Sequence, residues 1–276
     1  MNRAAQPMSE LEPTGAITIA RRFRGPAESG NGGYVCGRFA ERLVPAPRAA
    51  RVRLRVPPPL ERPLVVEAAA GEARLRVDGA DGALVAEARA LDVDVSGLLA
   101  IAPVPPSFAE AAGAAHGFRG FHRHPYPGCF VCGPERAEGD GLRIFPGPLV
   151  GRPGVAAPWI PDASLAAPGT AVGSGGRVGP EFVWAALDCP GGFAFPLASD
   201  RAILLGELAV ERRGDVHVGE RCVVLGWEIG TEGRRHFVAT ALFGEDGACR
   251  GVARATWFEV PATAADAVPG RLGEVA

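Results

Sequence analysis

The chain has 276 residues, of which 47% are hydrophobic and 22% charged, and its 29 basic and 31 acidic side chains give a net charge of −2. This composition is typical of a soluble globular protein with one large domain or two ordinary ones. The nearly balanced charge gives no attraction for nucleic acid or anionic membranes, so we expect neither as a partner. The sequence contains no lysine, which excludes Schiff-base chemistry and a G-K-[ST] phosphate loop.

In the first half, the pattern predicts a short strand over 16–20, a glycine-rich turn and then an amphipathic helix in "SGNGGYVCGRFAERL". Alternating apolar residues predict strands near 52–56, around 65 and over 73–77. The turn "DGADG" (78–82) then leads into a strand over 83–90.

The second half repeats this order. The predicted elements are a short strand over 142–145, a fully buried helix over 182–187, strands over 202–210, 221–228 and 236–243, a turn over 244–247, and a last strand over 248–258. The closing hairpins even share letters, "DGALVAEARA" (81–90) and "DGACRGVARA" (246–255), which favours a duplication.

Each half is therefore predicted to be a curved antiparallel sheet wrapped around one central helix. The predicted fold class is α+β, a double hotdog. The predicted organisation is an N-terminal hotdog unit (1–95), a linker (96–140) and a C-terminal hotdog unit (141–276).

The two predicted central helices carry a short motif. In "NGGYVCGRFAE" (31–41) and "GPEFVWAALD" (179–188), the chain resembles the tandem, double-hotdog members of the acyl-CoA thioesterase superfamily, closest to the phenylacetate-pathway type. That family has a pattern of roughly H-G-G-x(5)-[LA]-[AL]-D on its central helix. Here Asn31 replaces the histidine, Gly32 and Gly33 match, Ala40 occupies the acid position of the first half, and Asp188 occupies that of the second.

The resemblance implies one complete site per chain, divided between the halves. Asp188 would act as general base or nucleophile, and Asn31 would orient the substrate. The amides of Gly32, Gly33 and Tyr34 would hold the oxyanion at the helix N-terminus, where backbone N–H groups are free. We also predict that Gly32, Tyr34 and Glu181 contact the substrate.

Each of these residues also has a structural interpretation. Asp188 precedes Cys-Pro-Gly-Gly and could end the helix, Asn31 could be an N-cap, and Glu181 could complement the helix dipole. Tyr34 could be a packing aromatic. Cys189 is a weak candidate nucleophile because no histidine is near it in the sequence.

The resemblance implies a thioesterase that hydrolyses an acyl-CoA or acyl-carrier thioester, with CoA as part of the substrate and no further cofactor. The six scattered cysteines do not suggest a disulfide framework, so we expect a reduced, cytoplasmic setting. The alternative is a non-catalytic acyl-CoA binding or regulatory protein. A hydratase is disfavoured because neither predicted helix contains the histidine such enzymes pair with their aspartate. Double-hotdog chains already contain a dimer-like unit, and they can pair again as homodimers.

The segment "GCFVCGPER" (128–136) could instead hold a metal. Cys129 and Cys132 lie near His116, His122 and His124, and two cysteines with two histidines can complete a zinc shell. The spacing is not that of a usual finger and a second C-x2-C pair is missing, so we expect no metal. A redox pair is disfavoured too, because no thioredoxin-like βαβ pattern surrounds it. A C-F-x-C-G stretch often introduces the hotdog domain of the family, and we interpret the segment in that way.

Overall fold

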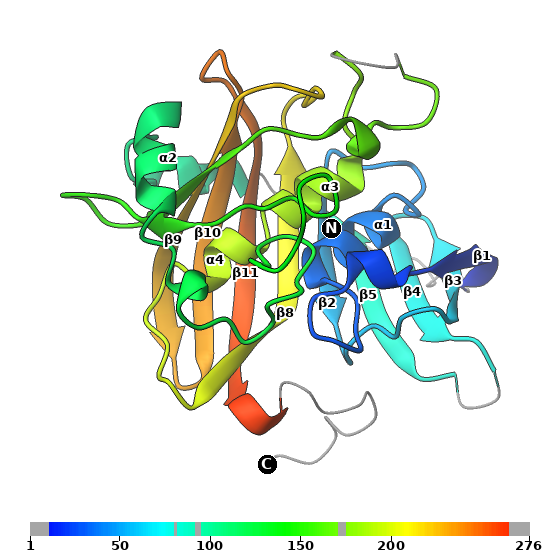
Figure 1. Ribbon diagram of the computed structural model, residues 1–276. Coiled ribbons are helices and arrows are strands. Elements are labelled where there is room, and N and C mark those ends of the chain that lie inside the picture. Colours follow the sequence, from blue (N-terminus) through cyan, green and yellow to red (C-terminus); the bar gives the residue numbers. More distant parts are fainter. Residues whose placement is uncertain (1–10, 80–81, 92–94, 171–174, 265–276) are drawn as a thin grey trace, which may run out of the picture.

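A computed structural model of the chain describes residues 11–79, 82–91, 95–170 and 175–264. Its strands form one 11-stranded sheet in which every paired neighbour is antiparallel (Figure 1). Within these ranges no helix is long and apolar enough to cross a membrane.

The first half contains one strand, a central helix and then four strands, as the sequence predicted. The elements are β1 (Glu12–Thr18), a 3-10 turn (Arg21–Phe23), α1 (Gly32–Ala40), β2 (Ala49–Leu54), β3 (Pro63–Ala69), β4 (Glu72–Val77) and β5 (Leu84–Ala90). The strands alternate between buried and partly exposed residues, because successive side chains point to opposite faces. In β4, for example, Ala73 and Leu75 are buried and their neighbours are not.

The second half has the same plan. Its elements are β6 (Gly147–Pro148), β7 (Val155–Trp159), a 3-10 turn (Ala163–Leu165), α3 (Pro180–Ala186), α4 (Cys189–Gly192), β8 (Arg201–Arg212), β9 (Cys222–Glu232), β10 (Arg235–Phe243), β11 (Cys249–Pro261) and a 3-10 turn (Ala262–Ala264). The predicted buried helix and the four long strands are confirmed. The turn over 244–247 is also confirmed, with Gly247 in the left-handed region at φ +76°.

One predicted strand is wrong. Residues 142–145 form no strand, because Arg143 has a left-handed φ of +52° that interrupts the extended run. The amides of Leu142 and Ile144 instead donate to the carbonyls of Phe130 and Val131, so this stretch packs against the C-x-x-C loop.

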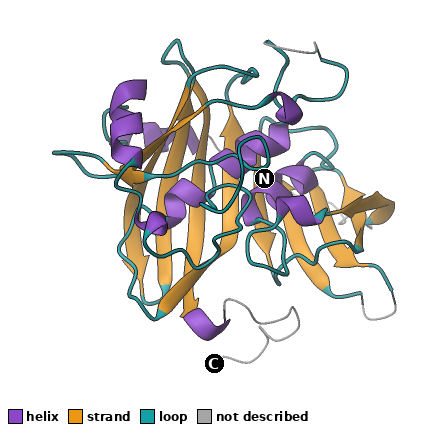
Figure 2. Cartoon of the chain, viewed as in Figure 1, coloured by secondary structure: helices purple, strands orange, loops and turns teal. Residues whose placement is uncertain are grey.

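The strand order is mirrored about the centre of the sheet. The order is β1-β3-β4-β5-β2 followed by β8-β11-β10-β9-β7-β6. Apart from the additional edge strand β6, each half therefore places its strands in the same sequence from its outer edge inward. The halves meet where β2 pairs with β8, from Ala49 opposite Glu211 to Arg53 opposite Glu207. Figure 2 shows helices in the middle of the view with strands on both sides, and one further helix, α2, at the upper left.

The central helices α1 and α3 pack directly against each other, and glycine makes the close approach possible. A Cβ on Gly33 would lie 2.4 Å from the Asp188 Cβ, and a Cβ on Gly37 would lie 2.7 Å from the Glu181 Cα. As residue numbers rise along α1, the contacted numbers fall along α3, so the two helices are antiparallel. The start of α1 therefore meets the end of α3.

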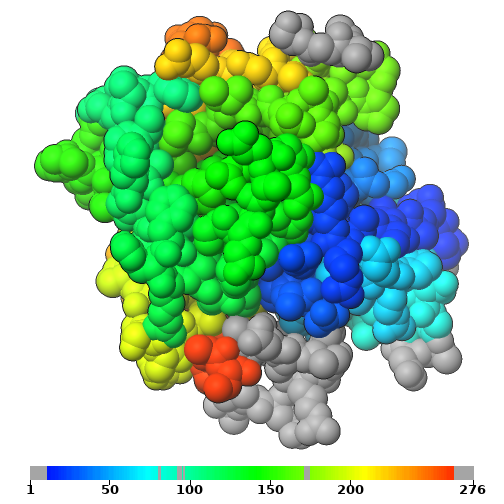
Figure 3. Space-filling model, viewed as in Figure 1, coloured from blue at the N-terminus to red at the C-terminus, as the bar shows by residue number. Residues whose placement is uncertain are grey.

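The segment between the halves is more than a linker. It contains two 3-10 turns and a helix, which are Val95–Ile101, α2 (Phe108–Ala115) and Arg119–Phe121. Ser107 and Glu110 begin α2 with a reciprocal capping box. The main core includes buried side chains from both halves and from this segment, such as Phe39, Phe130 and Leu208. Figure 3 shows the green surface of the segment adjoining the blue N-terminal half.

Candidate active site

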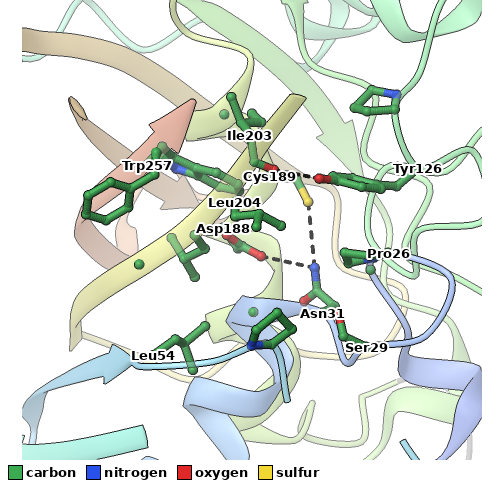
Figure 4. A pocket seen from close by; sticks show the side chains of 18 of the residues that line it. Pro26, Ser29, Asn31, Leu54, Tyr126, Asp188, Cys189, Ile203, Leu204 and Trp257 are labelled. Atoms are coloured by element: carbon green, nitrogen blue, oxygen red, sulfur yellow. Dashed lines mark hydrogen bonds between the residues drawn. The ribbon is translucent and has the colours of Figure 1, made fainter. Parts of the chain in front are cut away.

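Asn31 connects the two central helices. Its side-chain oxygen caps α1 by accepting the Tyr34 N–H at 2.9 Å, and its Nδ2 donates to Asp188 Oδ2 at 3.0 Å. The Gly33 N–H donates to the same carboxylate oxygen at 2.9 Å. Figure 4 shows the Asn31 amide and the Asp188 carboxylate pointing toward each other. The motif residues of the two halves therefore meet in one place.

Asp188 lies between α3 and α4 and is only 1% exposed. It directly follows the end of α3 and occupies the N-cap position of α4, but its side chain makes no cap hydrogen bond there. Its Oδ1 is buried and has no hydrogen-bond partner among the described residues. Burial raises the pKa of the carboxyl to about 7, although the hydrogen bonds from Gly33 and Asn31 act in the opposite direction. A carboxyl of this kind can both accept and return a proton near neutral pH.

The amides expected to hold an oxyanion differ in their availability. The Gly33 N–H is bonded to Asp188, and the Tyr34 N–H is bonded to Asn31. Gly32 lines the cavity described below, and within the described ranges its amide has no acceptor. Of the three amides, Gly32 is thus the one left to meet a substrate oxygen.

Tyr34 and Glu181 lie away from this cavity. The Tyr34 ring stacks on Phe23 with a centroid distance of 4.0 Å and is 5% exposed, and burial raises its pKa to about 12. Glu181 forms an ion pair with Arg38 at 3.5 Å. Neither residue lines the cavity, so their positions favour the structural interpretations of both, packing aromatic and helix-start acid.

A cavity of about 380 Å³ opens beside Asn31 and Asp188. Its size is in the range of small-molecule sites, and most of its wall is apolar. The wall comes from both halves, with Leu54 at the end of β2, Pro58 after it, Ile203 and Leu205 in β8, and Trp257 in β11. Two arginines, Arg55 and Arg234, also line it. Arg55 forms an ion pair with Glu87, whereas Arg234 forms none with the carboxylates of the described residues.

The C-x-x-C segment belongs to the same cavity. His124, Tyr126, Cys129 and Cys132 line it, together with Cys189. The Tyr126 hydroxyl donates to the Ile203 carbonyl at 3.0 Å and ties the segment to β8. Sequence reasoning placed this segment at the seam between halves, and its contribution to the cavity was missed. The sequence did contain one signal, because Cys189 directly follows the motif residue Asp188. In the structure its sulfur lies 3.8 Å from that of Cys129.

The fold was compared with known proteins. No protein-family model matches the sequence, and no curated protein matches it significantly. Solved structures do match. An acyl-CoA thioesterase II, TesB2, from Mycobacterium marinum aligns with a TM-score of 0.54 and 13% identity over 89% of this chain and 92% of that one.

Two further structures agree. A tesB protein from Mycobacterium avium subs paratuberculosis aligns with a TM-score of 0.52 and 14% identity, over 84% of this chain and 88% of that one. A conserved protein with the hot dog fold from Alicyclobacillus acidocaldarius aligns with a TM-score of 0.52 and 10% identity, over 91% of this chain and 96% of that one. At these identities the likeness concerns the fold. The chain has the hotdog fold of the TesB-type acyl-CoA thioesterases.

Proposed function

We propose that the chain is a tandem double-hotdog thioesterase that hydrolyses an acyl-CoA or acyl-carrier thioester. The observation that carries the proposal is Asp188, a buried carboxylate in the wall of an apolar cavity. Its Oδ2 accepts two hydrogen bonds, and its Oδ1 has no partner among the residues that the structure describes. The mirrored strand order supports the tandem arrangement. The similarity of the fold to acyl-CoA thioesterases supports the substrate class.

The chemistry follows from the two oxygens of Asp188. Hydrogen bonds from Asn31 and Gly33 fix Oδ2 and so aim Oδ1. As a general base, Oδ1 takes a proton from water while the water oxygen attacks the thioester carbonyl carbon. The carbonyl oxygen becomes an oxyanion that the Gly32 amide stabilises at the positive end of α1. The carbon–sulfur bond then breaks, and the departing sulfur takes the proton back.

The cavity suggests how a thioester would be oriented. The apolar side chains from β8 and β11 suit an acyl group, which is stabilised by leaving water. Arg55 and Arg234 suit the phosphates of CoA, since a guanidinium binds phosphate through paired hydrogen bonds and this chain has no lysine. The thioester carbon would then lie between them, near Asp188.

The test is thiol release from a panel of acyl-CoA esters by the wild-type chain and Asp188→Asn. We expect turnover by the wild type and a fall of about 10²–10⁴-fold in kcat for Asp188→Asn, the range for loss of a general acid–base group. Glu41→Gln is the matched control, because this carboxylate follows the other end of α1, 3.8 Å from Arg212, and does not line the cavity.

Two outcomes would contradict the proposal. Tight binding of CoA esters without turnover would replace the enzyme by the non-catalytic acyl-CoA binding protein. Full turnover by folded Asp188→Asn, with folding checked by thermal denaturation, would remove Asp188 from the mechanism.

A further inference from the structure

Three cysteine sulfurs that the proposed hydrolysis does not use lie together at the cavity. Cys129 and Cys132 come from the loop between the halves, and Cys189 begins α4. All three are buried, none is in a disulfide, and their sulfurs lie within 4.8 Å of one another. The Cys129 and Cys189 sulfurs are 3.8 Å apart. From these positions we infer that Cys129, Cys132 and Cys189 together bind one zinc ion.

The distances fit such an ion. A Zn–S bond of about 2.3 Å in a tetrahedral shell separates the sulfurs by about 3.8 Å, which is close to the spacing of Cys129 and Cys189. Three thiolates favour a borderline or soft cation over magnesium or calcium, which prefer oxygen ligands.

The C-x-x-C loop is built to present its two sulfurs on one side. The Gly133 N–H donates to the Cys129 carbonyl at 2.9 Å and closes a tight turn. A Cβ on Gly133 would lie 2.5 Å from the backbone N and O of Cys129 and from the Pro127 carbonyl, so glycine is required. The two sulfurs of the loop thus lie at the cavity, where the Cys189 sulfur also lies.

Two side chains place N–H groups near the sulfurs. Asn31 Nδ2 is 3.8 Å from both the Cys129 and the Cys189 sulfur, and His124 Nε2 is 3.3 Å from the Cys132 sulfur. The Tyr126 N–H donates to His124 Nδ1 at 2.9 Å, so this hydrogen bond assigns the ring proton of neutral His124 to Nε2. His124 therefore donates to Cys132 and supports the site from outside, as groups beyond the ligands commonly do.

The three cysteines and Asp188 all line the cavity, so a fourth ligand would come from the cavity. Three protein ligands with one open position are typical of catalytic zinc sites, whereas structural sites are closed by four. Each thiol that binds as a thiolate releases its proton to solvent. The inference goes beyond the proposed hydrolysis, in which Asp188 and Asn31 act without a metal.

The full chain, reduced and freed of metal with a chelator, tests the site. We expect it to bind one equivalent of Zn²⁺ in competition with a chromophoric chelator, and Co²⁺ to give a thiolate charge-transfer band. Cys129→Ala, Cys132→Ala and Cys189→Ala should each lose that equivalent. Cys222→Ala should keep it, because Cys222 is also buried and free but does not line the cavity. His124→Phe should keep the stoichiometry, with affinity lowered about 10–100-fold.

Several results would overturn the inference. The first is a folded, reduced wild type that binds no Zn²⁺, and the second is Zn²⁺ binding that the three cysteine substitutions leave unchanged. The third is an intact mass lower than the calculated mass by two hydrogen atoms that returns to the calculated value with a reductant, because this indicates a disulfide. Complete loss in His124→Phe would overturn the assignment of three ligands. If the cysteine variants do not fold, the cobalt spectrum of the wild type decides, because the band requires thiolate ligation. Thiol release by the zinc-free chain separates the two proposals. If the zinc-free chain hydrolyses thioesters but binds no Zn²⁺, the proposed hydrolysis stands and the zinc site is wrong.

Discussion

The two ends of the α1–α3 pair have the same geometry and different chemistry. At one end, the start of α1 meets the end of α3, and Asn31, Gly33 and Asp188 bond to one another beside the cavity. At the other end, Ala40 is buried at the position that corresponds to Asp188 when the two helices are aligned at their N-caps, Asn31 and Gly179, and Glu181 pairs with Arg38. The backbone arrangement alone therefore makes no site.

Two additions distinguish the first end. Asn31 places a side-chain amide at the helix start, and Asp188 supplies a buried carboxylate that this amide can hold. At the second end, Gly179 precedes α3 and provides no side-chain cap. We therefore attribute the proposed reactivity of the first end to a polar cap opposite a buried acid.

The largest expected effect comes from separating the helices at either end. Gly33→Ala places a Cβ 2.9 Å from the Trp184 carbonyl oxygen and 2.4 Å from the Asp188 Cβ, and Gly37→Ala places one 2.8 Å from the Trp184 Cβ. We expect each to lower the free energy of unfolding by about 1–3 kcal/mol, the usual cost of overpacking, as measured by chemical denaturation. Only Gly33→Ala should also abolish thiol release, because it displaces Asp188. Equal losses of kcat in the two folded variants would erase the distinction between the ends.

A smaller effect is expected at Asn31, where capping and positioning can be separated. Asn31→Ala removes the cap and should lower the free energy of unfolding by about 1 kcal/mol. Asn31→Ser restores a capping oxygen and should recover most of that loss, but it cannot donate to Asp188 as the amide does. We therefore expect kcat to stay low in both variants while KM changes little. Recovery of kcat by Asn31→Ser would show that Asn31 acts only as a cap.

The smallest effect is expected at the second end. Glu181→Gln removes an ion pair whose Arg38 side chain is 37% exposed, so we expect a loss of only about 0–1 kcal/mol of unfolding free energy. Thiol release and KM should be unchanged, because Glu181 does not line the cavity. A higher KM for acyl-CoA would return Glu181 to the substrate-binding role predicted from the sequence.

Much of the fold could be predicted because its signals are local. The alternation in β4 and the apolar helix around Phe182–Leu187 depend on residues adjacent in sequence. The failed strand over 142–145 depends on the backbone angle of Arg143, which residue type does not reveal. The helix α2 was missed because its alanine-rich sequence carries little periodic pattern.

The site divides in the same way. Asn31 and Asp188 could be identified through a motif, and their separation of 157 residues was bridged by knowing where central helices meet. No motif predicts that Gly33 and Tyr34 use their amides within the protein. Nor could the sequence place Cys189 beside Cys129, since that contact depends on how the loop between the halves folds over the cavity.

The two halves that pair through the β2–β8 ladder belong to one polypeptide, which gives the molecule a property that two separate chains would lack. Because the segment between β5 and β6 tethers the halves, each half meets the other at a local concentration set by the tether, whatever the dilution of the protein. Two identical chains would also receive every mutation twice, once at each end of the helix pair. In this chain one half can lose its acid at Ala40 while the other keeps Asp188, so covalent linkage allows the two halves to diverge.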